Sequence, residues 1–254
     1  MTPKIQEAVD KLTGVFEGWN EVVAVAVNSF GDDRFDPYFS LSFDVYTSTE
    51  VRGLPTREMA FGDVGAFESA LLTHKDRFLM DDLPVRVEYK QTSRFDELVS
   101  AAMAGECRLR DTGTYPFRRV VDAKPVFARS SWLETLRANL SELPDGFWEQ
   151  LRTAQQASAE HLYADLSAAA MREDSFYFQV TGGTFLVKLC ALLFAINRAF
   201  EPSPRALQSE VLELGLIPDS LPANMENFVA IPSSFTLSQR AELAELMITA
   251  VLSL

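Results

Sequence analysis

The stretch that most constrains the fold is residues 22–46, where two apolar runs flank a polar turn. The first run, VVAVAV, is rich in β-branched residues without polar alternation, which indicates a strand buried on both faces. The turn is rich in Asn, Ser, Gly, Asp and Pro, which interrupt regular structure. The second run, SLSFDVYT, places Ser42 and Asp44 on one face of a second strand. A carboxylate beside a buried sheet is costly unless a cation or a metal ion accompanies it.

A later run, VRVEY, predicts another strand, on which Arg86, Glu88 and Lys90 share one face. Glu88 is therefore a candidate to converge with Asp44. Two interpretations stay open at this point. Acids on adjoining strands can hold one metal ion, since hard cations prefer oxygen ligands. Alternatively, the acids form ion pairs with neighbouring cations, because Arg86 and Lys90 flank Glu88.

Strands that alternate with helices predict an α/β domain over residues 1–124. The apolar periodicity of residues 3–18 indicates an amphipathic helix before the hairpin. The expected elements after the hairpin are a polar loop at 51–62, a helix at 63–79 capped by Asp63, the strand that contains Glu88, a helix at 94–106, and a short strand at 107–111 followed by a turn.

The remaining residues, 125–254, predict an all-α domain, a helical bundle packed on the α/β domain. Ser130 or Ser131 and Glu134 are placed to form a capping box at the start of its first helix. Pro202 and Pro204 end the most apolar of the helices. The expected helices cover residues 130–143, 146–171, 174–200, 203–214 and 237–254.

Composition narrows the class of protein. The formal net charge of −13 argues against broad nucleic-acid binding, which needs a basic surface. Cys107 and Cys190 are far apart and have no metal-ligand spacing, so we expect reduced, buried thiols. The N-terminal MTPKIQEAVDKL lacks the apolar core of a signal peptide, and the apolar run at 185–196 is too short to span a bilayer. We therefore expect a cytoplasmic protein that does not bind membranes.

The hairpin resembles the active-site hairpin of the DNA polymerase β-like nucleotidyltransferase superfamily. In that superfamily a strand ends in Gly-Ser, and the next strand carries Asp-x-Asp or Asp-x-Glu. Here Asn28-Ser29 stands where Gly-Ser would be, and Ser42-Phe43-Asp44 stands where Asp-x-Asp would be. GECRLRDTG and LVKLCALLFAINRAFEPSPRAL also look like parts of bacterial members near the aminoglycoside and lincosamide nucleotidyltransferases.

The resemblance implies a transferase that moves a nucleoside monophosphate from a nucleoside triphosphate to a small-molecule acceptor. It implies Mg²⁺ held by Asp44 and Glu88, the latter as the third acid of the superfamily. Asn28, Ser29 and Ser42 would contact the nucleotide or its phosphates. Lys188 would meet a phosphate if it faces the cleft, and the alternative is that its side chain extends to the protein surface. Ser42 stands in place of the first acid and is a weaker, neutral ligand.

The loss of that acid supports an alternative, in which the chain is a degenerate, non-catalytic relative that binds a nucleotide as a sensor or engages a protein partner. A second alternative is a toxin-like or antitoxin-like partner module. Asp36 is a weaker candidate for the missing acid, because it precedes Pro37. His74 and His161 have no partner at a recognisable spacing and are expected to face solvent.

Overall fold

The computed structural model describes residues 2–28, 39–70, 74–109, 113–230 and 235–254. The chain divides into two compact units, each made of two segments. The first unit comprises Met1–Ser100 and Arg119–Glu142, and the second comprises Ala101–Arg118 and Leu143–Leu254. This division differs from the single boundary predicted at residue 124. Residues 101–118 belong with the helical unit because their contacts lie there, whereas 125–142 belong with the sheet.

A six-stranded mixed sheet with the order β3-β4-β5-β2-β1-β6 forms the centre of the first unit. β1 and β2 are antiparallel, as the hairpin pattern predicts, whereas β2 and β5 are parallel. This register sets Asp44 directly beside Glu88. The strands are β1 (Val22–Val27), β2 (Leu41–Thr47), β3 (Gly65–Ala70), β4 (Lys75–Met80), β5 (Leu83–Gln91) and β6 (Lys124–Ala128).

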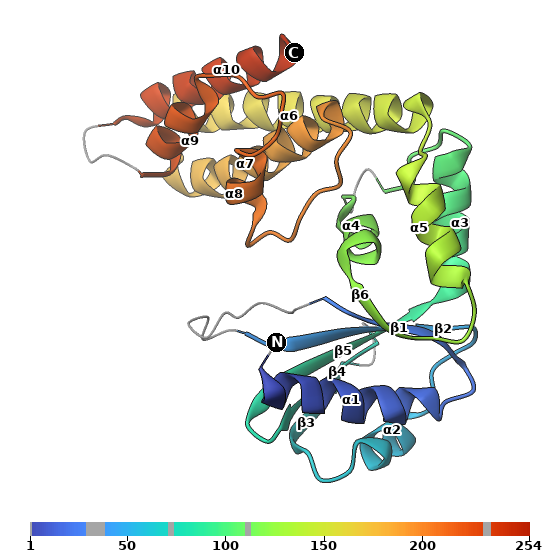
Figure 1. Cartoon of the computed structure of the whole chain (residues 1–254). Helices are drawn as coiled ribbons and strands as arrows, with labels where there is room; N and C mark the ends of the chain where they lie inside the picture. The colour runs from blue at the N-terminus through green and yellow to red at the C-terminus, as the bar shows by residue number, and fades with distance from the viewer. Residues whose placement is uncertain (1, 29–38, 71–73, 110–112, 231–234) are drawn as a thin grey trace. The chain divides into compact units, whose positions relative to one another are not determined.

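Different helices pack on the two faces of the sheet. Helices α1 (Pro3–Glu17) and α2 (Leu54–Phe61) cover one face (Figure 1), where Phe16 contacts both Phe43 and Phe61 in a buried core. On the other face, Tyr46 contacts aromatic residues of α3 (Thr92–Met103) and α5 (Trp132–Ser141). Asp44 therefore lies on the face of the sheet towards α3 and α5.

Two expectations for the segment after the hairpin are wrong. Residues 63–79, predicted as a helix, contain strands β3 and β4, with residues 71–73 outside the described part. The alternating burial of β4, with Asp76, Phe78 and Met80 inward, follows a period of two. Residues 51–62, predicted as a loop, contain α2. Its proline lies in the first turn, where a helix tolerates proline, so this residue does not exclude a helix.

The expectation of a strand at residues 107–111 also fails where the structure describes it. Residue 107 has no regular secondary structure, 108 and 109 lie in a turn, and 110–112 are outside the described residues. Helix α3 is confirmed at the position predicted for a helix at 94–106, within two residues at its start and three at its end. Three elements were not predicted at all, namely α4 (Tyr115–Asp122), β6 and, in the second unit, the helix at Leu221–Ala230.

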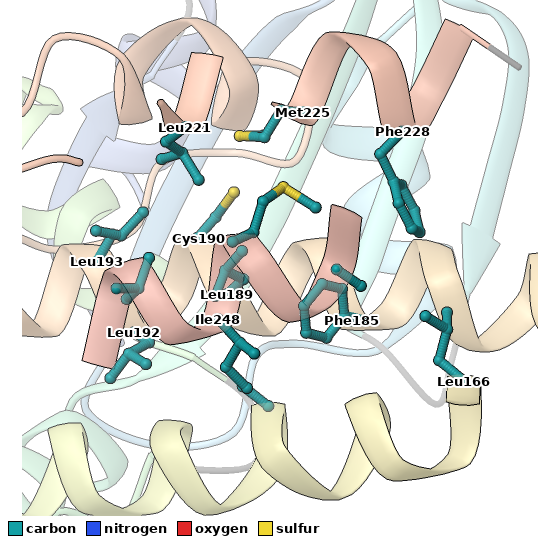
Figure 2. Close-up of a cluster of buried hydrophobic side chains, with 14 of the residues drawn as sticks. Leu166, Phe185, Leu189, Cys190, Leu192, Leu193, Leu221, Met225, Phe228 and Ile248 are labelled. Atoms are coloured by element: carbon teal, nitrogen blue, oxygen red, sulfur yellow. The ribbon is translucent and has the colours of Figure 1, made fainter. Parts of the chain in front are cut away.

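The second unit is helical, as its apolar periodicity predicts. α6 and α7 pack along each other, and α9 and α10 complete a core around the buried part of α7. Figure 2 shows Leu189 and Phe185 of α7 among side chains from the other three helices. The helices are α6 (Asp145–Met171), α7 (Ser175–Ile196), α8 (Leu207–Val211), α9 (Leu221–Ala230) and α10 (Leu237–Leu252).

Capping explains where several helices begin. Thr236 forms a capping box with Gln239 at the start of α10, and Asp174 accepts a hydrogen bond from the Tyr177 N–H at the start of α7. Ser131 precedes α5 as predicted, but its side chain makes no capping hydrogen bond.

Helix α7 is long and apolar enough to cross a membrane by length and composition, with a mean hydropathy of 1.7. More than half of that apolar window is nevertheless buried inside the protein. Packing in the helical core therefore accounts for most of its apolar character, as in the central helix of a bundle.

Candidate functional site

The candidate site is built on two rows of side chains that cross the sheet on the Asp44 face. In one row, Lys75 of β4 lies opposite Glu88 of β5, and Glu88 lies beside Asp44 of β2. In the second row, Arg77, Arg86 and Ser42 occupy the same three strands. Because neighbours in register point to the same face, both rows lie on one surface of the sheet.

The carboxylate of Asp44 is completely buried and accepts hydrogen bonds from four donors. Its Oδ1 accepts from Arg119 Nη2 at 2.6 Å and is paired with Lys90 Nζ at 2.7 Å. Its Oδ2 accepts from Arg119 Nε at 3.0 Å and from Asn28 Nδ2 at 2.6 Å. A carboxylate has about four lone-pair positions, so these contacts occupy all of them.

Glu88 and Ser42 belong to the same cluster. Glu88 Oε1 lies 3.2 Å from Lys75 Nζ and 3.4 Å from Arg119 Nη1. The hydroxyl of Ser42 accepts a hydrogen bond from Arg119 Nη2 at 3.3 Å. Arg119, which is 8% exposed, thus contacts every side chain that the sequence predicted for a metal site.

The charges in this cluster change its protonation equilibria. Burial alone raises the pKa of Asp44, but the positive charges of Lys90 and Arg119 outweigh it and hold that pKa below its ordinary value. Burial also lowers the pKa of Lys90, and Asp44 compensates only in part. Asp44 is therefore ionised in a network of hydrogen-bonded cations.

These residues do not fit a divalent metal ion. Asp44 has no lone pair left for an ion, and Ser42 offers a neutral oxygen that already accepts from Arg119. The cluster contains two carboxylates and the three cations Lys75, Lys90 and Arg119, so its formal charge is positive before any ion enters. Within the described residues, no group of three or more His, Cys, Asp or Glu side chains could hold a metal.

The sequence did not point to Arg119 as a member of the site. It comes from α4, 75 residues after Asp44, and reaches the sheet between the buried residues Phe117 and Val120. The available signal was a cation inside the apolar run of YPFRRVV, where burial requires an acidic partner. Which acid it meets depends on the tertiary fold.

In the second row, no acid lies beside Arg86 in register. Arg77 lies directly opposite Arg86, and like charges in this position repel each other. Glu68 of β3 is the neighbour of Arg77 on its other side. The Nε of Arg86 is buried and has no hydrogen-bond partner within the described residues. An acid at position 42 would lie beside Arg86, but Ser42 leaves this guanidinium without one.

The other predicted nucleotide contacts are distributed differently. Asn28 lies at the end of β1 and binds Asp44, as given above, and Ser29 is outside the described residues. Lys188 belongs to the second unit, where its charge acts on Glu201. Its role as a phosphate contact stays a prediction.

Glu201 is an acid of the second unit whose environment shifts its pKa. It accepts hydrogen bonds from the N–H and the Oγ1 of Thr114 at 3.2 Å and 3.4 Å. Burial raises its pKa, and the bonds from Thr114 and the charge of Lys188 offset only part of this effect. The neighbouring Cys190 is a free, buried thiol with a pKa raised to about 12 by burial and by Glu201.

A Glu201→Gln variant should therefore be more thermostable than the wild type at pH 8. A carboxyl whose pKa is raised on folding stabilises the fold below its unfolded pKa and loses that contribution as the pH rises through the folded value. Glutamine keeps the acceptor for Thr114 without ionising. Melting temperatures at pH 5 and pH 8 test this, with the exposed Glu213→Gln as control. An equal difference between variant and wild type at both pH values would contradict it.

Comparisons with known proteins agree with this architecture. No protein-family model matches the sequence, and no curated protein matches it significantly. Among solved structures, the chain is similar to a nucleotidyltransferase-like protein from Exiguobacterium sibiricum, with a TM-score of 0.54 and 14% sequence identity. The match covers 98% of this chain and 74% of that chain. At this identity the likeness concerns the fold, and the fold of this chain is nucleotidyltransferase-like.

Proposed function

We propose that this chain is a non-catalytic protein of nucleotidyltransferase-like fold that binds nucleotide phosphates without a metal ion. The observation that carries the proposal is the saturation of Asp44 by Arg119, Lys90 and Asn28. Nucleotidyl transfer spreads negative charge over phosphoryl oxygens, and metal ions held by carboxylates stabilise that charge. Here the acids that would hold the ion are already neutralised by side chains of the same chain.

The second row of the sheet supports phosphate binding. Arg77 and Arg86 repel each other across β4 and β5, and an anion between them would relieve that repulsion. Guanidinium groups bind phosphate with two parallel hydrogen bonds, and the Arg86 Nε is the donor without a partner in the described residues. Cations gathered on one face of a chain with a net charge of −13 also favour a local anion site.

Calorimetric titration of each nucleoside triphosphate tests this proposal, first with Mg²⁺ and then with EDTA. We expect binding that persists in EDTA and produces no pyrophosphate. Arg86→Gln should weaken binding by about tenfold or more, the loss of one charge-assisted contact. Arg94→Gln is the matched control, because Arg94 is an exposed arginine of α3, and it should bind as the wild type does.

Ser42→Asp is a second variant with a defined expectation. It places a carboxylate beside Arg86, so it should compete with phosphate and weaken binding in EDTA. Three results would contradict the proposal: binding that requires Mg²⁺ and disappears in Asp44→Asn, release of pyrophosphate, or no binding by a folded protein. The first two would support a metal-dependent transferase, and the third would favour a protein-interaction module.

A further inference from the structure

The outer face of α7 is apolar and exposed along about three turns. Phe176 is 80% exposed, Val180 54% and Val187 48%, and Gly183 is exposed between them. Residues 175–187 contain no charged side chain, although charged residues make up 23% of the chain. The opposite face of the helix packs in the core of Figure 2, so burial there does not explain the apolar outer face. Extended exposed apolar surfaces of this kind mark interaction sites.

The spacing of these four residues is that of a helix–helix seam. Steps of four, three and four residues join Phe176, Val180, Gly183 and Val187. This is the alternation with which two helices pack side by side. The stripe is also symmetric, since residues 176 and 187 lie equally far from its centre, as do 180 and 183. Two antiparallel copies would therefore place Phe176 against Val187 and Val180 against Gly183, a large residue against a smaller one at each level.

We propose that a second copy of this chain occupies this face, with the two α7 helices antiparallel about a two-fold axis. A two-fold interface uses the same patch on both copies and requires a self-complementary patch. Together with Tyr177, which follows Phe176 and is 40% exposed, the stripe offers on the order of 400 Å² of side-chain surface per copy. A stable dimer buries about 800 Å² per partner, so the stripe can form the apolar centre of such an interface.

Gly183 lets the two α7 helices approach each other closely. A Cβ atom added to Gly183 would meet nothing within 4 Å in a single copy, so the space above it is open. In the dimer that space receives Val180 of the second copy. A larger side chain at position 183 would thus meet no neighbour in the monomer, but it would clash with Val180 of the second copy in the dimer.

Sedimentation equilibrium of the full chain, at concentrations from about 1 to 200 µM, measures the association. The wild type should dimerise in this range. Val180→Glu buries two unpaired carboxylates per dimer and should weaken association by about 100-fold or more. Phe176→Glu should act in the same direction. The control is Met59→Glu in the first unit. Met59 is 81% exposed, as much as Phe176, and its substitution should leave association unchanged.

Gly183→Leu distinguishes specific packing of the two helices from non-specific hydrophobic association. It enlarges the apolar surface, so non-specific association would strengthen, whereas the antiparallel seam predicts that dimerisation weakens by about tenfold. A wild type that stays monomeric at all concentrations would overturn the proposal. So would a Gly183→Leu variant that associates more tightly. Binding of the monomer to neutral lipid vesicles, lost in Phe176→Glu, would assign the face to a membrane surface instead.

Discussion

Replacing Arg119 with methionine is expected to lower the free energy of unfolding of the first unit by about 3 kcal/mol. The substitution removes the charge that pairs with two carboxylates, Asp44 and Glu88. It puts an uncharged, apolar side chain in the place of the guanidinium. Breaking one partner of a buried ion pair costs about 3–5 kcal/mol. The lower end applies here, because Lys90 still compensates Asp44 in the variant.

Urea denaturation gives the free energy, and hydrogen–deuterium exchange of β2 and β5 shows that the loss falls on the first unit. Arg118→Met is the matched control, since the adjacent arginine forms a half-exposed ion pair with Glu210 and should cost less than about 1 kcal/mol. If both substitutions cost the same small amount, the cluster around Asp44 does not stabilise the sheet.

The same cluster gives the stability a defined dependence on pH. Asp44 has a pKa lowered on folding, so its contribution is present above the ordinary carboxyl pKa and is lost as the pH falls through the folded value. Arg119→Met removes one of the two cations that lower this pKa. The acid-induced loss of stability should therefore begin at a higher pH in the variant than in the wild type.

The hairpin was predictable because its signals are local. Uninterrupted β-branched residues in β1 and alternation in β2 determine the strands, and alternation in β5 places Glu88 and Lys90 on one face. The sequence also left open an ion-paired interpretation of Asp44, and Lys90 does pair with it. Arg119 was not predictable, since the helix that carries it is distant in sequence.

Apart from α9, which was not predicted, the helices of the second unit followed from their periodicity, and α6 and α7 begin and end close to the predicted residues. The error at residues 63–79 has a different origin. ALLTHKDRFL contains good helix formers, and apolar residues three and four apart fit a helix as well as a strand. Tertiary contacts make this segment a strand. It pairs with β5, and as a strand it buries Asp76 against a cation on α2.

That buried acid carries the largest expected effect. Asp76 is fully buried and accepts from Arg57 Nε at 2.8 Å, Arg57 Nη2 at 3.1 Å and Tyr89 Oη at 2.7 Å. Asp76→Asn preserves the shape but leaves the buried guanidinium of Arg57 without its carboxylate. We expect a loss of about 3–5 kcal/mol in urea denaturation, at the upper end because no other acid pairs with Arg57 in the described residues.

The matched control for this prediction is Asp81→Asn, at an exposed turn position with a φ of 48°, a conformation that asparagine tolerates. It should change the free energy of unfolding by no more than about 0.5 kcal/mol. Asp76 lies opposite Val87 in register, on the face of the sheet away from Glu88 and Asp44. Asp76→Asn should thus destabilise the first unit while the folded fraction binds nucleotide with unchanged affinity. An affinity that fell with stability would mean that the two faces are coupled, and that the anion site depends on the Arg57 pair as well as on Arg86.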